Sequence, residues 1–178
     1  MAAPTVTRAT EAETPLVNAL LSEAAGWLAD RGVDQWPHPF PENIVRASVL
    51  RRDTYLAWRD GDPVGTLAVY WADARFWGDR PPDAGYVHRL AVARAARGDG
   101  LGARLLDWAG ELVAARGRRW LRLDCGADNT ALRAFYEHLG FEHVDDVEVT
   151  VPGAGTAPGP WTASLYQRRA EASERRTL

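Results

Sequence analysis

Residues 84 to 103 read Ala-Gly-Tyr-Val-His-Arg-Leu-Ala-Val-Ala-Arg-Ala-Ala-Arg-Gly-Asp-Gly-Leu-Gly-Ala, and the rest of the chain is arranged around them. The first part, 86–92, has the composition of a buried strand, and 97–102 is a turn punctuated by glycines. A helix with strong apolar periodicity follows, from 101 to about 116. Glycines let a ligand approach the backbone, and the first N–H groups of a helix have no partner within it and carry partial positive charge. This stretch therefore predicts an anion site suited to a phosphate or diphosphate.

Strands and helices alternate on both sides of this stretch. The turn Asp60-Gly61-Asp62-Pro63 predicts a hairpin between two of the strands. The order β-α-α-β-β-β-α-β-α-β-β predicts a mixed α/β fold with a single domain over 1–168 and a charged tail over 169–178. Strands are expected at 5–9, 54–59, 64–71, 86–92, 120–125, 141–151 and 161–167, helices at 11–31, 42–51, 101–116 and 130–139, and loops at 32–41, 72–83 and 152–160.

Composition excludes several classes of function. A formal net charge of −3 and a pI near 5.8 argue against nucleic-acid and anionic-membrane partners. All 21 basic residues are arginine, which excludes chemistry at a lysine nucleophile. The single cysteine, Cys125, excludes an intramolecular disulfide, and scattered histidines predict no metal site. No signal-peptide core and no membrane-length apolar run is visible, so a cytoplasmic location is expected.

Two known patterns fit the glycine turn. Gly98-x-Gly100-x-x-Ala103 matches the dinucleotide fingerprint, with Asp124 about 20 residues on as a ribose-binding acid. In that fold, however, the glycines end the strand directly, whereas here 93–97 intervene, and 178 residues leave little room for two nucleotide halves. The other pattern is Arg97-x-x-Gly100-x-Gly102, which resembles the pyrophosphate turn of acyl-CoA-dependent N-acetyltransferases of the GNAT superfamily. A turn with glycines for geometry alone is the third interpretation.

The resemblance to the GNAT superfamily extends beyond the turn. Residues 88–92 and 97–102 look like its central strand and pyrophosphate loop. Asn129 and 131–141, which end in Leu-Gly-Phe, look like its second motif. The similarity covers roughly 84–145 and is weak in the N-terminal third, where substrate choice usually lies.

The resemblance implies a mixed, mostly antiparallel sheet flanked by helices and splayed between 86–92 and 120–124. It implies acetyl-CoA as the acyl donor, no metal, and a fold that is often a homodimer. Backbone groups of Leu90, Ala91 and Val92 would pair with the pantetheine arm and polarise the thioester carbonyl. The diphosphate would be held by the backbone of the turn, with Arg97 as the charged contact, so that the donor site comprises Arg97, Gly98, Asp99, Gly100, Leu101 and Gly102.

Four residues stand out for the chemistry. In similar enzymes a tyrosine at the position of Tyr136 protonates the leaving thiolate, although Tyr136 also lies on an apolar helix face. Asn129 suits a helix N-cap and, by resemblance, a pantetheine contact. The strand 84–92 has no Glu or Asp, so His88 is the candidate general base, with Asp124 or a water chain as rivals. A bulge near Leu90 would change the face that His88 occupies.

The acceptor end is predicted from aromatic loops. Trp36, in a loop with three prolines, is the favoured acceptor contact, with Trp71 and Asp124 beside it. Phe40, Trp27 and Trp77 belong to elements of the same end, where they form either a cage or plain core. The expected reaction is direct attack of a small-molecule amine on acetyl-CoA in a ternary complex. Alternatives are a protein N-terminal or lysine acetyltransferase, a non-catalytic acyl-CoA sensor and a nucleotide-dependent oxidoreductase. Cys125 is either a small buried residue or an acyl carrier.

Overall fold

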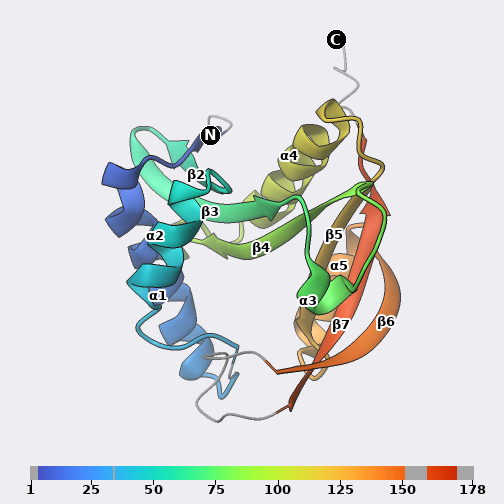
Figure 1. Ribbon diagram of the computed structural model, residues 1–178. Coiled ribbons are helices and arrows are strands. Elements are labelled where there is room, and N and C mark those ends of the chain that lie inside the picture. The colour runs from blue at the N-terminus through green and yellow to red at the C-terminus, as the bar shows by residue number, and fades with distance from the viewer. Residues whose placement is uncertain (1–3, 34, 151–159, 172–178) are drawn as a thin grey trace. The chain divides into compact units, whose positions relative to one another are not determined.

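The computed structural model describes residues 4–33, 35–150 and 160–171. Within them, seven strands are hydrogen-bonded in the order β1-β2-β3-β4-β5-β7-β6 (Figure 1). The pairs β1–β2, β2–β3 and β5–β7 are antiparallel and β4–β5 is parallel, which confirms the predicted mixed, mostly antiparallel α/β domain. The strands are β1 Thr5–Arg8, β2 Thr54–Arg59, β3 Asp62–Tyr70, β4 Ala84–Val92, β5 Trp120–Gly126, β6 Glu142–Thr150 and β7 Pro160–Arg169; the helices are α1 Thr14–Ala29, α2 Glu42–Leu50, α3 Ala74–Trp77, α4 Leu101–Ala115 and α5 Thr130–His138, with short 3-10 turns η1 Glu11–Glu13 and η2 Arg94–Ala96.

The structure differs from the sequence expectation mainly at element ends. The predicted loop 72–83 contains the short helix α3, because Trp77 is buried against Tyr86 and tertiary packing overrides the local turn signals. Strand β7 reaches Arg169, one residue past the predicted domain end. Residue 151 of an expected strand, residues 152–159 of the expected loop and residues 172–178 of the expected tail lie outside the described residues. No helix in the described part of the chain is long and apolar enough to cross a bilayer.

Two compact units make up the chain. The first comprises Met1–Val69, His88–Gly102 and Thr150–Trp161, and the second comprises Tyr70–Val87, Ala103–Val149 and Thr162–Leu178. Strand β4 contributes its first half to the second unit and its last half to the first. The predicted donor residues 90–102 therefore belong to one unit, and Tyr136 and Asn129 to the other.

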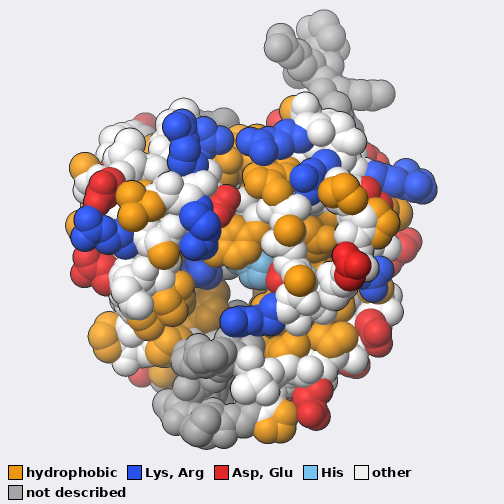
Figure 2. All heavy atoms as spheres, in the orientation of Figure 1, with side chains coloured by type: hydrophobic (Ala, Val, Ile, Leu, Met, Phe, Trp, Pro, Cys, Tyr) orange, Lys and Arg blue, Asp and Glu red, His pale blue; other side chains and the backbone are white. Residues whose placement is uncertain are grey.

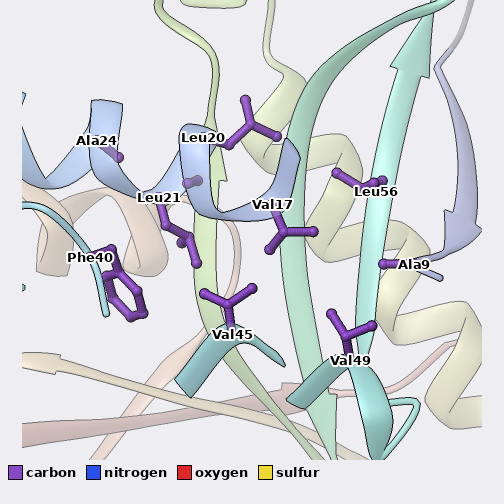
Figure 3. Close-up of a cluster of buried hydrophobic side chains, with 10 residues drawn as sticks. Ala9, Val17, Leu20, Leu21, Ala24, Phe40, Val45, Val49 and Leu56 are labelled. Atoms are coloured by element: carbon purple, nitrogen blue, oxygen red, sulfur yellow. The ribbon is translucent and has the colours of Figure 1, made fainter. Parts of the chain in front are cut away.

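The core of the first unit lies between α1, α2 and the strands. Val17, Leu20 and Leu21 of α1 recur at helical spacing, and Val17 and Leu21 point towards Val45 and Val49 of α2 (Figure 3). Both helices pack against the strands through this cluster, which fixes the position of α1 within the unit. The other members are Ala9, Ala24, Phe40, Leu56 and Ala91.

The second unit is a β-layer with α3 and α5 on opposite faces. Arg122 and Leu123 are adjacent on β5 and so point to opposite faces. The guanidinium carbon of Arg122 lies 5.0 Å from the centre of the Trp77 ring on α3. The partner of Leu123 on β7 is Tyr166, whose ring lies 6.0 Å from that of Tyr136 on α5. Alternation along β5 then places Cys125 on the α5 face.

Charged side chains are intermingled on the face seen in Figure 2, where blue side chains lie among red and orange ones. Every basic side chain there is an arginine, because the sequence has no lysine. Apart from protonated histidine, guanidinium groups are therefore the only positively charged side chains of this sequence.

Candidate active site

The glycine turn is a backbone cradle at the beginning of α4. Gly98 and Gly100 have φ values of 86° and 70°, in the left-handed region that favours glycine. A Cβ added at either position would meet no atom within 4 Å, so open space faces the turn. Helix α4 begins directly afterwards at Leu101, whose side chain is buried and fixes the helix start. N–H groups beside a helix N-terminus fit a diphosphate, and the role of this turn as the donor site stays a prediction.

Asp99 is held by an ion pair across the first unit. Arg59 Nη1, at the end of β2, donates to Asp99 Oδ2 at 2.8 Å, and the Arg59 side chain is only 10% exposed. A carboxylate in a phosphate-binding turn would repel the ligand, and the Arg59 guanidinium offsets that charge while it fixes the turn to β2. The ion pair thus anchors Asp99 and the turn to β2, and a contact of Asp99 with the donor stays a prediction.

Arg59→Ala should weaken acetyl-CoA binding by about tenfold, because the turn loses its contact to β2 and Arg59 no longer offsets the negative charge of Asp99. Asp99→Asn in the same chain should restore most of that affinity by removing the charge. Titration calorimetry of the two single variants and the double variant measures the coupling. Equal losses in Arg59→Ala and in the double variant would contradict the electrostatic role.

Arg97 is turned towards α1. Its guanidinium carbon lies 3.7 Å from the centre of the Trp27 ring, at stacking distance. Desolvation by burial lowers the pKa of Arg97, and the neighbouring cations Arg94 and Arg31 lower it further. Trp27, expected near the acceptor, therefore packs on the turn that is predicted to form the donor site.

Strand β4 is irregular where the pantetheine contacts are predicted. Its register with β5 covers four residue pairs, from Ala84↔Trp120 to Val87↔Leu123, although β4 continues to Val92. Arg89, which lies between His88 and Leu90, has a φ of 51°, which is left-handed for a non-glycine residue. Arg89 Nη2 donates to Ser48 Oγ at 2.8 Å, which holds this conformation.

The residues on either side of Arg89 in β4 are predicted to contact acetyl-CoA or the acceptor amine. His88, just before Arg89, is half-buried. Leu90 and Val92 are half-buried, and Ala91 points into the core of the first unit. Their backbone roles towards acetyl-CoA, and the role of His88 as base, stay predictions.

Tyr136 is buried on the inner face of α5. Its ring packs against Phe135, Phe141 and Tyr166 at centroid distances of 5.7, 5.8 and 6.0 Å. Its hydroxyl makes no hydrogen bond to any other residue that the structure describes. Burial raises the pKa of Tyr136, with smaller contributions from Cys125 and Asp124, so the phenol stays protonated.

Three further residues of the second unit have defined surroundings. Asn129 is the N-cap of α5, and its Oδ1 accepts from Leu132 N at 3.1 Å, so its expected capping role is confirmed. Burial raises the pKa of the Cys125 thiol to about 12, which keeps it unreactive near neutral pH and disfavours an acyl-cysteine step. Asp124 is half-buried and follows the β4–β5 pairs, opposite Leu165 of β7.

Of the other aromatic residues predicted for the acceptor end, two are buried in the core and two are half-buried. Phe40 and Trp77 are buried, 6% and 4% exposed, and are core residues rather than cage walls. Trp36 is half-buried and makes an edge contact with Phe40 at 5.8 Å. Trp71 is half-buried with the guanidinium of Arg116 4.0 Å from its ring. Acceptor contacts by Trp36 and Trp71 stay predictions.

The sequence did not predict the contacts of Arg59 and of α1 with the glycine turn and the segment before it. A signal for the second was present, since Glu23, Trp27 and Arg31 recur every four residues on one stripe of α1. Arg59 gave no signal, because it lies 40 residues before Asp99 and only packing brings the two together.

Comparison with known proteins agrees with this geometry. The model of the acetyltransferase (GNAT) family matches residues 18–141. The uncharacterized N-acetyltransferase YesJ of Bacillus subtilis is 34% identical over 134 residues, which are 71% of this chain and 74% of that protein. A GNAT-family acetyltransferase structure from Listeria monocytogenes has a TM-score of 0.74 at 24% identity, covering 93% of this chain and 94% of its own.

A second structure, of YncA from Salmonella typhimurium with its cofactor acetyl-CoA, has a TM-score of 0.69 at 17% identity and covers 96% of this chain and 95% of its own. The mostly antiparallel sheet order also differs from the doubly wound parallel sheet that the dinucleotide fingerprint requires. The chain therefore belongs to the GNAT family of acetyltransferases and is an acetyl-CoA-dependent acyltransferase.

Proposed function

We propose that this protein transfers the acetyl group of acetyl-CoA to the primary amine of a small molecule, by direct attack of the amine in a ternary complex. The observation that carries the proposal is Tyr136, a buried phenol with a raised pKa and no hydrogen bond to another described residue. A neutral phenol that has no hydrogen-bond partner among the described residues is suited to donate its proton to a thiolate leaving group. A sensor domain that only binds acyl-CoA would gain nothing from it.

The chain's own residues divide the remaining work. Backbone N–H groups of the turn from Gly98 to Gly102 hold the diphosphate, and the Arg59–Asp99 pair fixes that turn. Backbone groups near Leu90 and Ala91 hold the pantetheine arm and polarise the carbonyl. The free amine attacks, His88 accepts the proton that its nitrogen loses as the carbon–nitrogen bond forms, and Tyr136 donates a proton to the departing sulfur. The amine nitrogen forms the new bond as the carbon–sulfur bond breaks.

The preference for a small acceptor rests on the loop after α1. Asn18 Nδ2 donates to Phe40 O at 2.8 Å, and Phe40 N donates to Ser22 Oγ at 3.0 Å, so α1 holds the end of this loop. Three prolines restrict the loop further. An anchored loop that presents Trp36 suits a compact acceptor better than an extended peptide, which needs a long open groove.

A panel of acceptors tests the proposal. Release of CoA is measured with small aliphatic and aromatic amines and with peptides that carry a free N-terminus or a lysine. We expect one class of small amine to exceed every peptide by about 100-fold in kcat/KM. A peptide as the best acceptor would reject the substrate class. Acetyl-CoA binding without CoA release for any amine would reject catalysis in favour of the sensor reading.

A further inference from the structure

One stripe of α1 forms a wall beside the donor turn. Glu23, Trp27 and Arg31 follow one another at intervals of four residues and so lie on one face of the helix. Glu23 Oε2 accepts from the backbone N of Arg94 at 2.9 Å, at the beginning of η2. One helical turn on, Trp27 stacks with Arg97, so two successive positions of α1 hold the segment that leads into the glycines.

Three guanidinium groups gather at this wall. The guanidinium carbons of Arg31 and Arg97 lie 4.0 and 3.7 Å from the centre of the Trp27 ring. Arg31 Nη1 also donates to Trp27 O at 3.3 Å. Arg94 is close enough to lower the pKa of Arg97, as Arg31 does. The indole thus serves as a platform that orders two cations beside a third.

The cluster has an excess of positive charge. Among the charged groups that shift the pKa of Arg97, Arg31 and Arg94 are cations and Glu23 is the one carboxylate. One oxygen of Glu23 is already engaged by the Arg94 backbone. Like charges that are held together by stacking repel one another, so a bound dianion would relieve a repulsion that exists in the free protein.

We infer that Arg31, Arg94 and Arg97, supported by Trp27, bind the 3′-phosphomonoester of CoA and make the enzyme distinguish CoA from dephospho-CoA. This inference rests on the proposed function. A phosphomonoester carries nearly two negative charges and three terminal oxygens, which match several guanidinium forks. The diphosphate carries one charge per phosphate and is served by the backbone of the turn, while the Arg97 guanidinium is directed onto α1. Arg97 is thereby reassigned from the diphosphate to the monoester.

Paired ligands and paired variants test this assignment by titration calorimetry. Wild-type protein, Arg31→Gln and Arg94→Gln are each titrated with CoA and with dephospho-CoA, which lacks only the 3′-phosphate. Arg46→Gln is the matched control, because Arg46 is an exposed arginine of α2 in the same unit, paired with Glu11. All three substituted side chains are exposed, and a thermal unfolding scan verifies that each variant is folded.

We expect wild-type protein and Arg46→Gln to bind CoA at least about tenfold more tightly than dephospho-CoA. Arg31→Gln and Arg94→Gln should each lower this ratio by weakening CoA alone, and the ratio should shrink in high salt. Equal affinity of wild-type protein for the two ligands would overturn the inference and leave the proposed function standing. Equal weakening of both ligands in the variants would also overturn it, because the arginines would then serve the diphosphate. Failure of wild-type protein to bind either ligand would overturn the proposed function as well.

Discussion

Gly100→Val should lower the affinity for acetyl-CoA by at least about 100-fold. Gly100 has a φ of 70°, where a β-branched residue is strained, and the added side chain would occupy the open space that faces the turn. The strain would shift the backbone N–H groups, and the side chain would keep a diphosphate away from them. Titration calorimetry with acetyl-CoA gives the affinity directly.

Gly117→Val is the matched control for this substitution. Gly117 follows α4 with a φ of 71°, and a Cβ there would also meet no atom within 4 Å. The backbone strain, about 1–2 kcal/mol in the free energy of unfolding, should therefore be similar in the two variants. Only Gly100→Val should lose affinity for acetyl-CoA. A comparable loss of affinity in both variants would show that backbone strain alone causes it.

Tyr136→Phe should reduce kcat by about 100-fold or more while leaving the affinity for acetyl-CoA unchanged. The substitution removes a hydroxyl that bonds to no other described residue, so the folded state should lose little stability. Because burial raises the pKa of Tyr136, its ionisation should not limit the wild-type rate up to about pH 9. Steady-state rates with a saturating amine, measured across pH, check both statements.

The neighbouring Tyr166 provides the control for Tyr136. Its hydroxyl donates to Glu137 Oε1 at 2.8 Å and accepts from Arg133 Nε at 3.0 Å. Tyr166→Phe should lower the free energy of unfolding by about 1–3 kcal/mol, because it leaves polar partners unsatisfied, while kcat stays close to wild type. The opposite pattern, with Tyr166→Phe inactive and Tyr136→Phe active, would move the proton donor to β7.

Local chemistry made part of this structure predictable. Gly98 and Gly100 adopt positive φ where the sequence indicated an anion turn, because only glycine takes that conformation at no steric cost. Asn129 caps α5 as expected, since its short side chain reaches the first free N–H groups. Tyr136 lies on the apolar face that the helical period indicated.

Features that depend on packing between distant segments were not predictable. Trp27 has the period of a core residue, and its position against Arg97, 70 residues later, follows from how α1 docks within its unit. The Arg59–Asp99 pair has the same origin. The left-handed φ of Arg89 in β4 is a backbone torsion that local sequence does not determine.

Direct transfer from acetyl-CoA to the amine is tested most directly by rapid mixing of the protein with acetyl-CoA, first without and then with the best acceptor. The chain offers no lysine, and burial raises the pKa of its one cysteine to about 12, so neither side chain is available as an acetyl carrier. We predict no burst of CoA before the amine is added, and afterwards one CoA for each acetylated amine. A burst equal to the protein concentration in the absence of amine would contradict direct transfer, because the acetyl group would then have passed to the chain itself.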